Sequence, residues 1–187
     1  MAELDDYRGE FRPDLKLSDF SKEALLRLLT AYARCYPGMD GLWFTLCRER
    51  FGDAIARELD EEIWARRALE PEARRVCQAL GIEGDDVTAL FKLFQTQPGF
   101  APLGFDIRYE LKSPRHGICT VWNCRSIEYF ARHDDWETAR WVCQRIDQLG
   151  FEAAAAYFNP AIKVIPLRLH PRGVDDRPHC VWEFRID

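Results

Sequence analysis

The sequence contains no uninterrupted apolar run of the roughly 18 residues that a membrane-spanning helix needs. Residues 1–14 are acidic and lack an apolar stretch, so they do not resemble a secretion signal. Basic residues are outnumbered, at a net charge of −5, and they alternate with acids, so no basic patch for nucleic acid is indicated. We therefore expect a soluble, cytoplasmic protein that binds neither membranes nor nucleic acid.

The familiar signatures of catalysis are also missing. The chain has no serine-nucleophile elbow, no glycine-rich phosphate loop and no dinucleotide fingerprint. It has no internal repeat and no low-complexity tract. Motifs alone therefore leave open whether the protein is an enzyme.

No Cys-x-x-Cys pair occurs among the seven cysteines. An odd number of cysteines without a secretion signal argues against a disulfide framework. The cysteines are therefore expected to be buried thiols, metal ligands or a reactive thiol.

Apolar spacing divides the chain into an arm over 1–17, a helical half over 18–97 and a second half over 104–187. The two halves are expected to form one compact unit. In the helical half, Ser21 is expected to cap a helix that Pro37 and Gly38 end, and Asp40 to cap the next. The second half alternates with period two and then returns to helical spacing, with Gly150 expected to separate two helices. Four strands are expected, over 105–111, 116–123, 163–169 and 180–186. The predicted fold is α+β, a helical half followed by a ββ-α-α-ββ antiparallel sheet.

In this layout four potential metal ligands converge. Cys124 follows a strand, Cys143 lies on a helix, and His170 and Cys180 stand at the two ends of one hairpin loop. Three thiolates and one imidazole suit tetrahedral zinc, with iron as the alternative metal. His179 competes with His170 as the imidazole ligand. The alternative is that the cysteines are small core residues.

Aromatic residues of both halves are candidates to line an apolar ligand pocket. We single out Trp43, Trp64 and Tyr109, with Arg125 to hold a ligand carboxylate. Further polar groups are expected from Asp40, Asp60 and Arg75. The alternative is that the aromatic residues simply fill the core.

The stretch from His170-Pro171-Arg172 to Pro178-His179-Cys180-Val181-Trp182-Glu183-Phe184 resembles the end of four-vinyl-reductase-type small-molecule-binding domains. The resemblance implies a metal-binding loop, with Cys143 and Cys180 at two ligand positions and His170 near a third. The glutamate ligand of those domains has no counterpart, since Leu167 and Arg168 stand in its place. We expect Cys124 to substitute for it.

A second resemblance covers nearly the whole chain. It rests on Gly41-Leu42-Trp43-Phe44, Phe51-Gly52-Asp53-Ala54, Asp60 with Trp64, Asn123-Cys124-Arg125-Ser126 and the ending Cys-x-Trp-Glu-Phe. These segments resemble an uncharacterised family of cytosolic bacterial and archaeal proteins. Some members are loosely similar to aminothiazoline-carboxylate hydrolases.

The leading hypothesis is a metal-stabilised domain that binds a hydrophobic or aromatic-acid small molecule, as a sensor or accessory protein. One alternative is a thiol- or metal-dependent hydrolase of small amides or cyclic compounds. Its thiol form would use Cys124 as the nucleophile and His116 or His133 as the base. A third hypothesis is a homodimeric interaction protein that pairs through an uncovered sheet face or edge.

Overall fold

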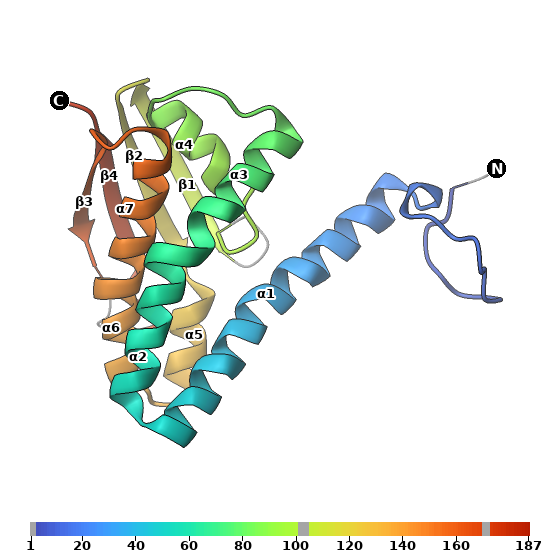
Figure 1. Ribbon diagram of the computed structural model, residues 1–187, viewed down its shortest axis with the longest axis horizontal. Coiled ribbons are helices and arrows are strands. Elements are labelled where there is room, and N and C mark those ends of the chain that lie inside the picture. The colour runs from blue at the N-terminus through green and yellow to red at the C-terminus, as the bar shows by residue number, and fades with distance from the viewer. Residues whose placement is uncertain (1–2, 101–104, 170–172) are drawn as a thin grey trace.

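A four-stranded antiparallel sheet forms one layer of the protein, and helices cover one of its faces (Figure 1). The computed structural model describes residues 3–100, 105–169 and 173–187. The strands follow the order β1-β2-β4-β3. Their bounds are Asp106–Ser113 (β1), His116–Asn123 (β2), Lys163–Arg168 (β3) and Cys180–Arg185 (β4). Two hairpins, β1-β2 and β3-β4, are thus joined through β2 and β4, which confirms the predicted ββ-α-α-ββ sheet.

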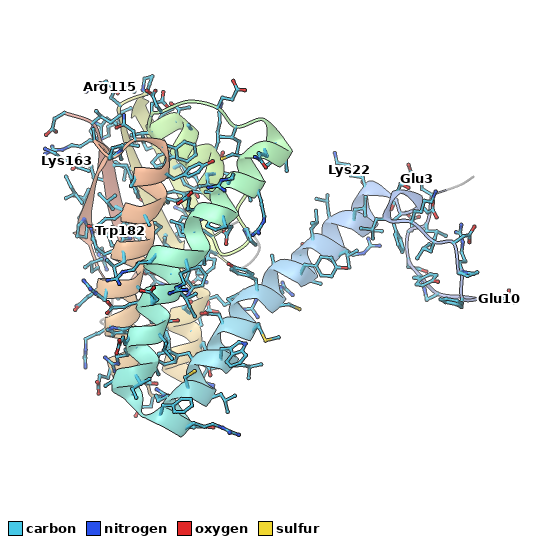
Figure 2. The ribbon with its side chains drawn as sticks, viewed as in Figure 1. Glu3, Glu10, Lys22, Arg115, Lys163 and Trp182 are labelled. Atoms are coloured by element: carbon cyan, nitrogen blue, oxygen red, sulfur yellow. The ribbon has the colours of Figure 1, made fainter. Side chains whose placement is uncertain are left out.

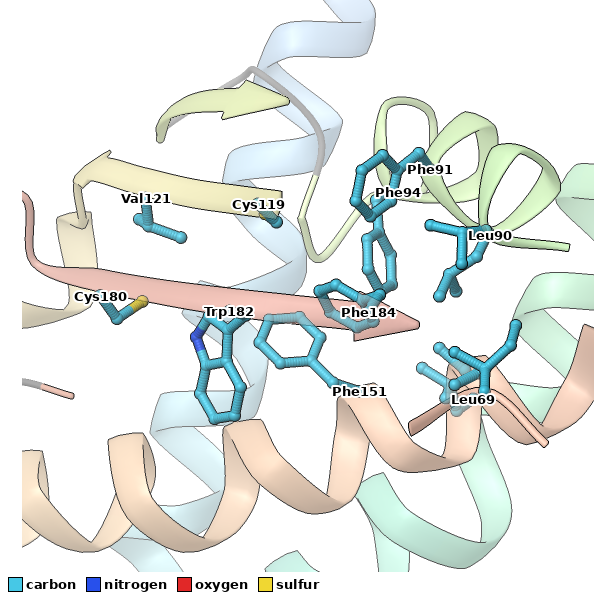
Figure 3. Close-up of a cluster of buried hydrophobic side chains, with 14 residues drawn as sticks. Leu69, Leu90, Phe91, Phe94, Cys119, Val121, Phe151, Cys180, Trp182 and Phe184 are labelled. Carbon is cyan, nitrogen blue, oxygen red and sulfur yellow. The ribbon is translucent and has the colours of Figure 1, made fainter. Parts of the chain in front are cut away.

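The alternating residues of β4 explain which face of the sheet is covered. Trp182 and Phe184 are fully buried on the helix side. Around them pack Phe94 and Phe151, with ring centroids 4.9–5.8 Å apart (Figure 3). Edge-to-face and tilted aromatic pairs at these distances add stabilisation to the burial of their surface. The core therefore joins residues of both halves of the chain.

The helical segments that follow β2 are α5 (Arg125–Arg132), α6 (Trp136–Trp141), the π-helical η3 (Val142–Ile146) and α7 (Asp147–Phe158). Of these segments, α7 packs against β3 on this face. The predicted break at Gly150 is wrong, since α7 runs through it. Phe151, Ala154 and Ala155 are buried there. Their burial outweighs the cost of roughly 1 kcal/mol of a glycine inside a helix.

Helices also make up the N-terminal half. They are a short 3-10 turn η1 (Leu17–Asp19), α1 (Lys22–Phe51), α2 (Asp53–Glu61), the π-helical η2 (Glu62–Ala68), α3 (Leu69–Leu80) and α4 (Val87–Phe94). As predicted, Ser21 caps α1 by accepting a hydrogen bond from the Ala24 N–H. Helix α4 lies in the core, whereas α2 and η2 run along the outside of the helical layer (Figure 1).

The predicted end of the first helix at Pro37 and Gly38 is wrong, because α1 is one helix of 30 residues. Proline removes one backbone hydrogen bond and usually kinks or breaks a helix. Contacts on both sides of Pro37 hold the helix together. Tyr36 donates a hydrogen bond to Glu72 of α3 at 2.6 Å, and Asp40 accepts one from Trp64 of η2 at 3.2 Å. Asp40 is therefore an interior residue and not a cap.

The sheet predicts a specific sensitivity at Gly117. A Cβ atom there would lie 2.5 Å from the ring of Phe91, a contact that forces the core to shift. Overpacking of this kind typically destabilises by about 1–3 kcal/mol, so Gly117→Ala should lower the melting temperature. Gly41→Ala is the matched control, because a Cβ on that α1 residue meets nothing within 4 Å. There alanine should raise the melting temperature, since it favours helix by about 1 kcal/mol. Equal melting temperatures of the two variants would contradict this packing.

Candidate functional site

A groove of about 530 Å³ lies where α1 diverges from α2 and η2. The residues that line it are Tyr36, Met39, Asp40, Trp43, Phe44, Cys47, Ala56, Leu59, Asp60, Ile63, Trp64 and Ala68. Its volume falls in the range of about 300–1,000 Å³ that is typical of small-molecule sites. The structure thus brings together the predicted ligand residues Trp43 and Trp64 and the predicted polar residues Asp40 and Asp60.

Helical periodicity explains how these side chains meet. Tyr36, Asp40, Trp43 and Cys47 recur three or four residues apart on α1, and Ala56, Asp60 and Trp64 recur four apart on the facing segment. Trp64 is also fixed on both sides. Its ring meets Tyr36 edge-on at 6.0 Å, and its indole N–H donates to Asp40 Oδ1.

Two carboxyl groups face this apolar groove. Burial, together with the negative charges of Asp40 and Glu61, raises the pKa of Asp60 to about 7. Burial also raises the pKa of Asp40, although the hydrogen bond from Trp64 opposes this. No described Lys or Arg lines the groove. At neutral pH Asp60 is therefore about half ionised, and no cation among the described lining residues balances its charge.

Tyr109 and Arg125 lie away from this groove. Tyr109 packs on Phe91 at 5.2 Å in the core, and its buried hydroxyl has no hydrogen-bond partner among the described residues. Arg125 is an exposed residue at the start of α5. Arg75 lines a neighbouring hollow with Glu72 and Pro98. The core therefore uses Tyr109 for packing, and the groove takes its polar groups from α1 and α2.

Three cysteines form a second cluster, away from the groove. Cys143 of η3 and Cys180 of β4 are buried, and Cys124, just before α5, packs against the residues around both. Burial raises the pKa of all three thiols, and the charge of the nearby Asp147 raises it as well. Among the described residues, no group of three or more His, Cys, Asp and Glu side chains is arranged to hold a metal ion. His170 lies outside the described residues.

The rival imidazole, His179, is held by backbone groups. Its Nδ1 accepts the Cys124 N–H at 2.8 Å, and its Nε2 lies 2.8 Å from the Val174 carbonyl oxygen. These bonds fix a neutral tautomer with Nε2 as the donor. Both ring nitrogens are therefore engaged, and His179 acts as a clamp that fixes the loop before β4.

The environment of Cys124 bears on thiol chemistry. Burial and the charge of Asp147 raise its pKa to about 11. Reactive thiols lie in positive surroundings that lower the pKa instead. Neither proposed base has a described contact with Cys124. His116 is hydrogen-bonded to Glu183, and His133 packs on Tyr129.

Comparison with known proteins gives one match. A model for a "Family of unknown function (DUF6125)" matches residues 17–186. No curated protein and no solved structure matches the chain. The likeness to four-vinyl-reductase-type domains and to aminothiazoline-carboxylate hydrolases stays a prediction. Among the described residues, no helix has the length and apolar character to cross a membrane.

The buried carboxyl of Asp60 predicts a pH-dependent stability. Because its pKa is raised in the folded protein, protonation favours folding, and this contribution is lost as pH rises from about 4 to about 7. Relative to wild type, Asp60→Asn should therefore gain about 2 kcal/mol of unfolding free energy between roughly pH 5 and 8. Urea unfolding at both pH values measures this. The exposed neighbour Glu58 is the control, and Glu58→Gln should show the same small difference at both pH values.

Proposed function

The chain belongs to the family of unknown function DUF6125, and we propose that it is a small-molecule binding module whose groove holds a ligand with a cationic head and an apolar body. The observation that carries the proposal is the pair of carboxyl groups, Asp40 and Asp60, set among the rings of Trp43 and Trp64. Aromatic faces and carboxylates are what organic ammonium groups bind.

The sign of the charge selects among ligands. A carboxylate ligand would be placed beside two groups of its own charge, whereas a cation would lower the pKa of Asp60 and be held by it. The groove therefore supports an amine or quaternary ammonium compound better than an aromatic acid. The rest of the lining is apolar and favours a hydrocarbon or ring attached to that head.

The exposure of Trp43 indicates where a ligand enters. Its side chain is 61% exposed at the rim, whereas Asp60 is only 9% exposed at the base. A ligand that enters head first would bring its cation to Asp60 and cover Trp43 with its apolar body. Binding would then bury the apolar surface that the free protein leaves in water.

A structural metal ion is the second part of the proposal. The specific support is that Cys124, Cys143 and Cys180, predicted as ligands from the sequence, lie close enough to affect one another's ionisation. Three thiolates suit zinc, which would lower the thiol pKa values that clustering raises, and His170 or Asp147 would supply the fourth ligand. Bound zinc would tie the loop before β4 to α5 and η3. A hydrolase that uses Cys124 as a thiolate has weaker support, because the thiol pKa is raised.

Benzyltrimethylammonium tests the proposed ligand class, because its charge does not change with pH. Calorimetry should show binding that tightens by about tenfold between roughly pH 6 and 8, as Asp60 loses its proton. Trp43→Ala should weaken binding by about tenfold, and Asp60→Asn should remove the pH dependence. Phenylacetate, which has a similar body and the opposite charge, is the matched control. Equal or tighter binding of phenylacetate would overturn the proposal.

Elemental analysis of purified protein tests the metal. One zinc ion per chain is expected in wild type, and Cys180→Ser should lose it and melt at a lower temperature, by about 2 kcal/mol or more. Cys77→Ser is the control, because Cys77 is also buried but packs on Ala73 and Leu93 in a separate cluster. It should keep its zinc. Metal-free wild type, or equal loss of metal from both variants, would contradict the site.

A further inference from the structure

Many large apolar side chains of helix α1 are exposed to solvent. It packs on α2 and reaches α3 through Tyr36, and its N-terminal half then leaves the body of the protein (Figures 1 and 2). Its large apolar residues with more than 40% of their surface exposed are Leu26, Leu29, Tyr32, Met39, Leu42, Trp43, Leu46 and Phe51. Ile55, Leu59 and Ile63 of α2 and η2 continue this surface at 44–46% exposure. Apolar surface of this extent marks an interaction site.

The apolar residues of α1 follow a spacing that reads the same in both directions. Leu25, Leu28, Leu29 and Tyr32 are separated by three, one and three residues. Met39, Leu42, Trp43 and Leu46 repeat these intervals. The two groups are symmetric about the midpoint between Cys35 and Tyr36. Two copies of α1 placed antiparallel around a two-fold axis at this point would match each group with the other.

Charge favours the same partner. The N-terminal half of α1 carries Lys22, Arg27 and Arg34 against one acid, Glu23. Besides Asp60, which is buried in the groove, the segment Asp53–Glu62 along which the second helix would lie carries four acids against one arginine. In the antiparallel arrangement the basic half of each helix meets the acidic segment of the other copy. A two-fold interface satisfies both copies at once, as is usual for homodimers.

We propose that the exposed apolar face of α1 is covered by α1 of a second copy of this chain, packed antiparallel to form a two-fold homodimer. Leu28 and Leu29 then lie opposite Trp43 and Leu42, and Tyr32 lies opposite Met39. The second helix covers the rim of the groove between α1 and α2. The inference goes beyond the proposed ligand and does not depend on it, since it rests on the apolar spacing and charge of α1.

Light scattering of the ligand-free full-length protein over a concentration series tests the dimer. Wild type should have twice the chain's mass of 21.9 kDa. The double variant Leu29→Glu/Tyr32→Glu should raise the dissociation constant by about 100-fold or more, because each dimer would bury four carboxylates. Both residues are more than half exposed on α1, so circular dichroism should show unchanged helix content. Leu80→Glu, at an exposed leucine of α3, should stay dimeric.

A zero-length carbodiimide cross-link tests the orientation. Lys22 and Glu49 are 27 residues apart on one helix, about 40 Å, so a bond between them must join two copies. The antiparallel dimer brings Lys22 beside Glu49 and Asp53 of the other copy, and these cross-linked peptides are expected in mass spectra. A monomeric wild type, a dimer insensitive to the double variant or a dimer without these links would overturn the proposal. Binding of monomers to phosphatidylcholine vesicles through α1 would also overturn it.

Discussion

Phe44 of α1 stacks on Trp141 of α6 with ring centroids 5.6 Å apart, and beside it Arg48 pairs with Asp135 at 2.9 Å. The guanidinium group of Arg57 on α2 also lies over the Trp141 ring, 5.1 Å from its centroid. These contacts attach the C-terminal end of α1 to the helical layer. Because they hold one end of a long helix, the other end is free to leave the body (Figure 1). The groove beside α2 and the exposed apolar face of α1 both exist because of this attachment.

The groove and the exposed face are two parts of one surface. Met39 and Trp43 belong to both, since they line the groove and stand on the apolar face of α1. A second copy that covers this face would also close the groove over a bound ligand. Under the two proposals together, the ligand would bind more tightly to the dimer, and by linkage it would strengthen the dimer by the same factor.

The sequence predicts the strands better than the ends of the helices. Alternation at Trp182 and Phe184 identifies the buried face of β4 without ambiguity, because side chains of a strand alternate strictly. Pro37 and Gly150 were misread because their local preference is weaker than the contacts made by neighbours such as Tyr36 and Phe151. Trp43, Trp64, Asp40 and Asp60 were identifiable as candidates, and helical spacing brings them together. The assignment of Tyr109 to the same pocket required knowledge of how the two halves pack, which spacing along the chain does not contain.

Cysteines that lie near one another indicate a metal site less strongly than cysteines arranged with the geometry of metal ligands. Cys124, Cys143 and Cys180 come from three segments of the chain and lie near one another. Buried cysteines also pack well as small apolar residues, as Cys77 does in a separate cluster and Cys119 does in the core beside Cys180. What separates this cluster from theirs is Asp147, whose pKa burial raises to about 7. Ionisation of these four groups side by side is unfavourable in the core, whereas a divalent cation would offset their negative charges. The proposed metal ion therefore rests on the electrostatics of the cluster and not on ligand geometry, because no group of three or more ligands in the described part of the chain is arranged to hold a metal.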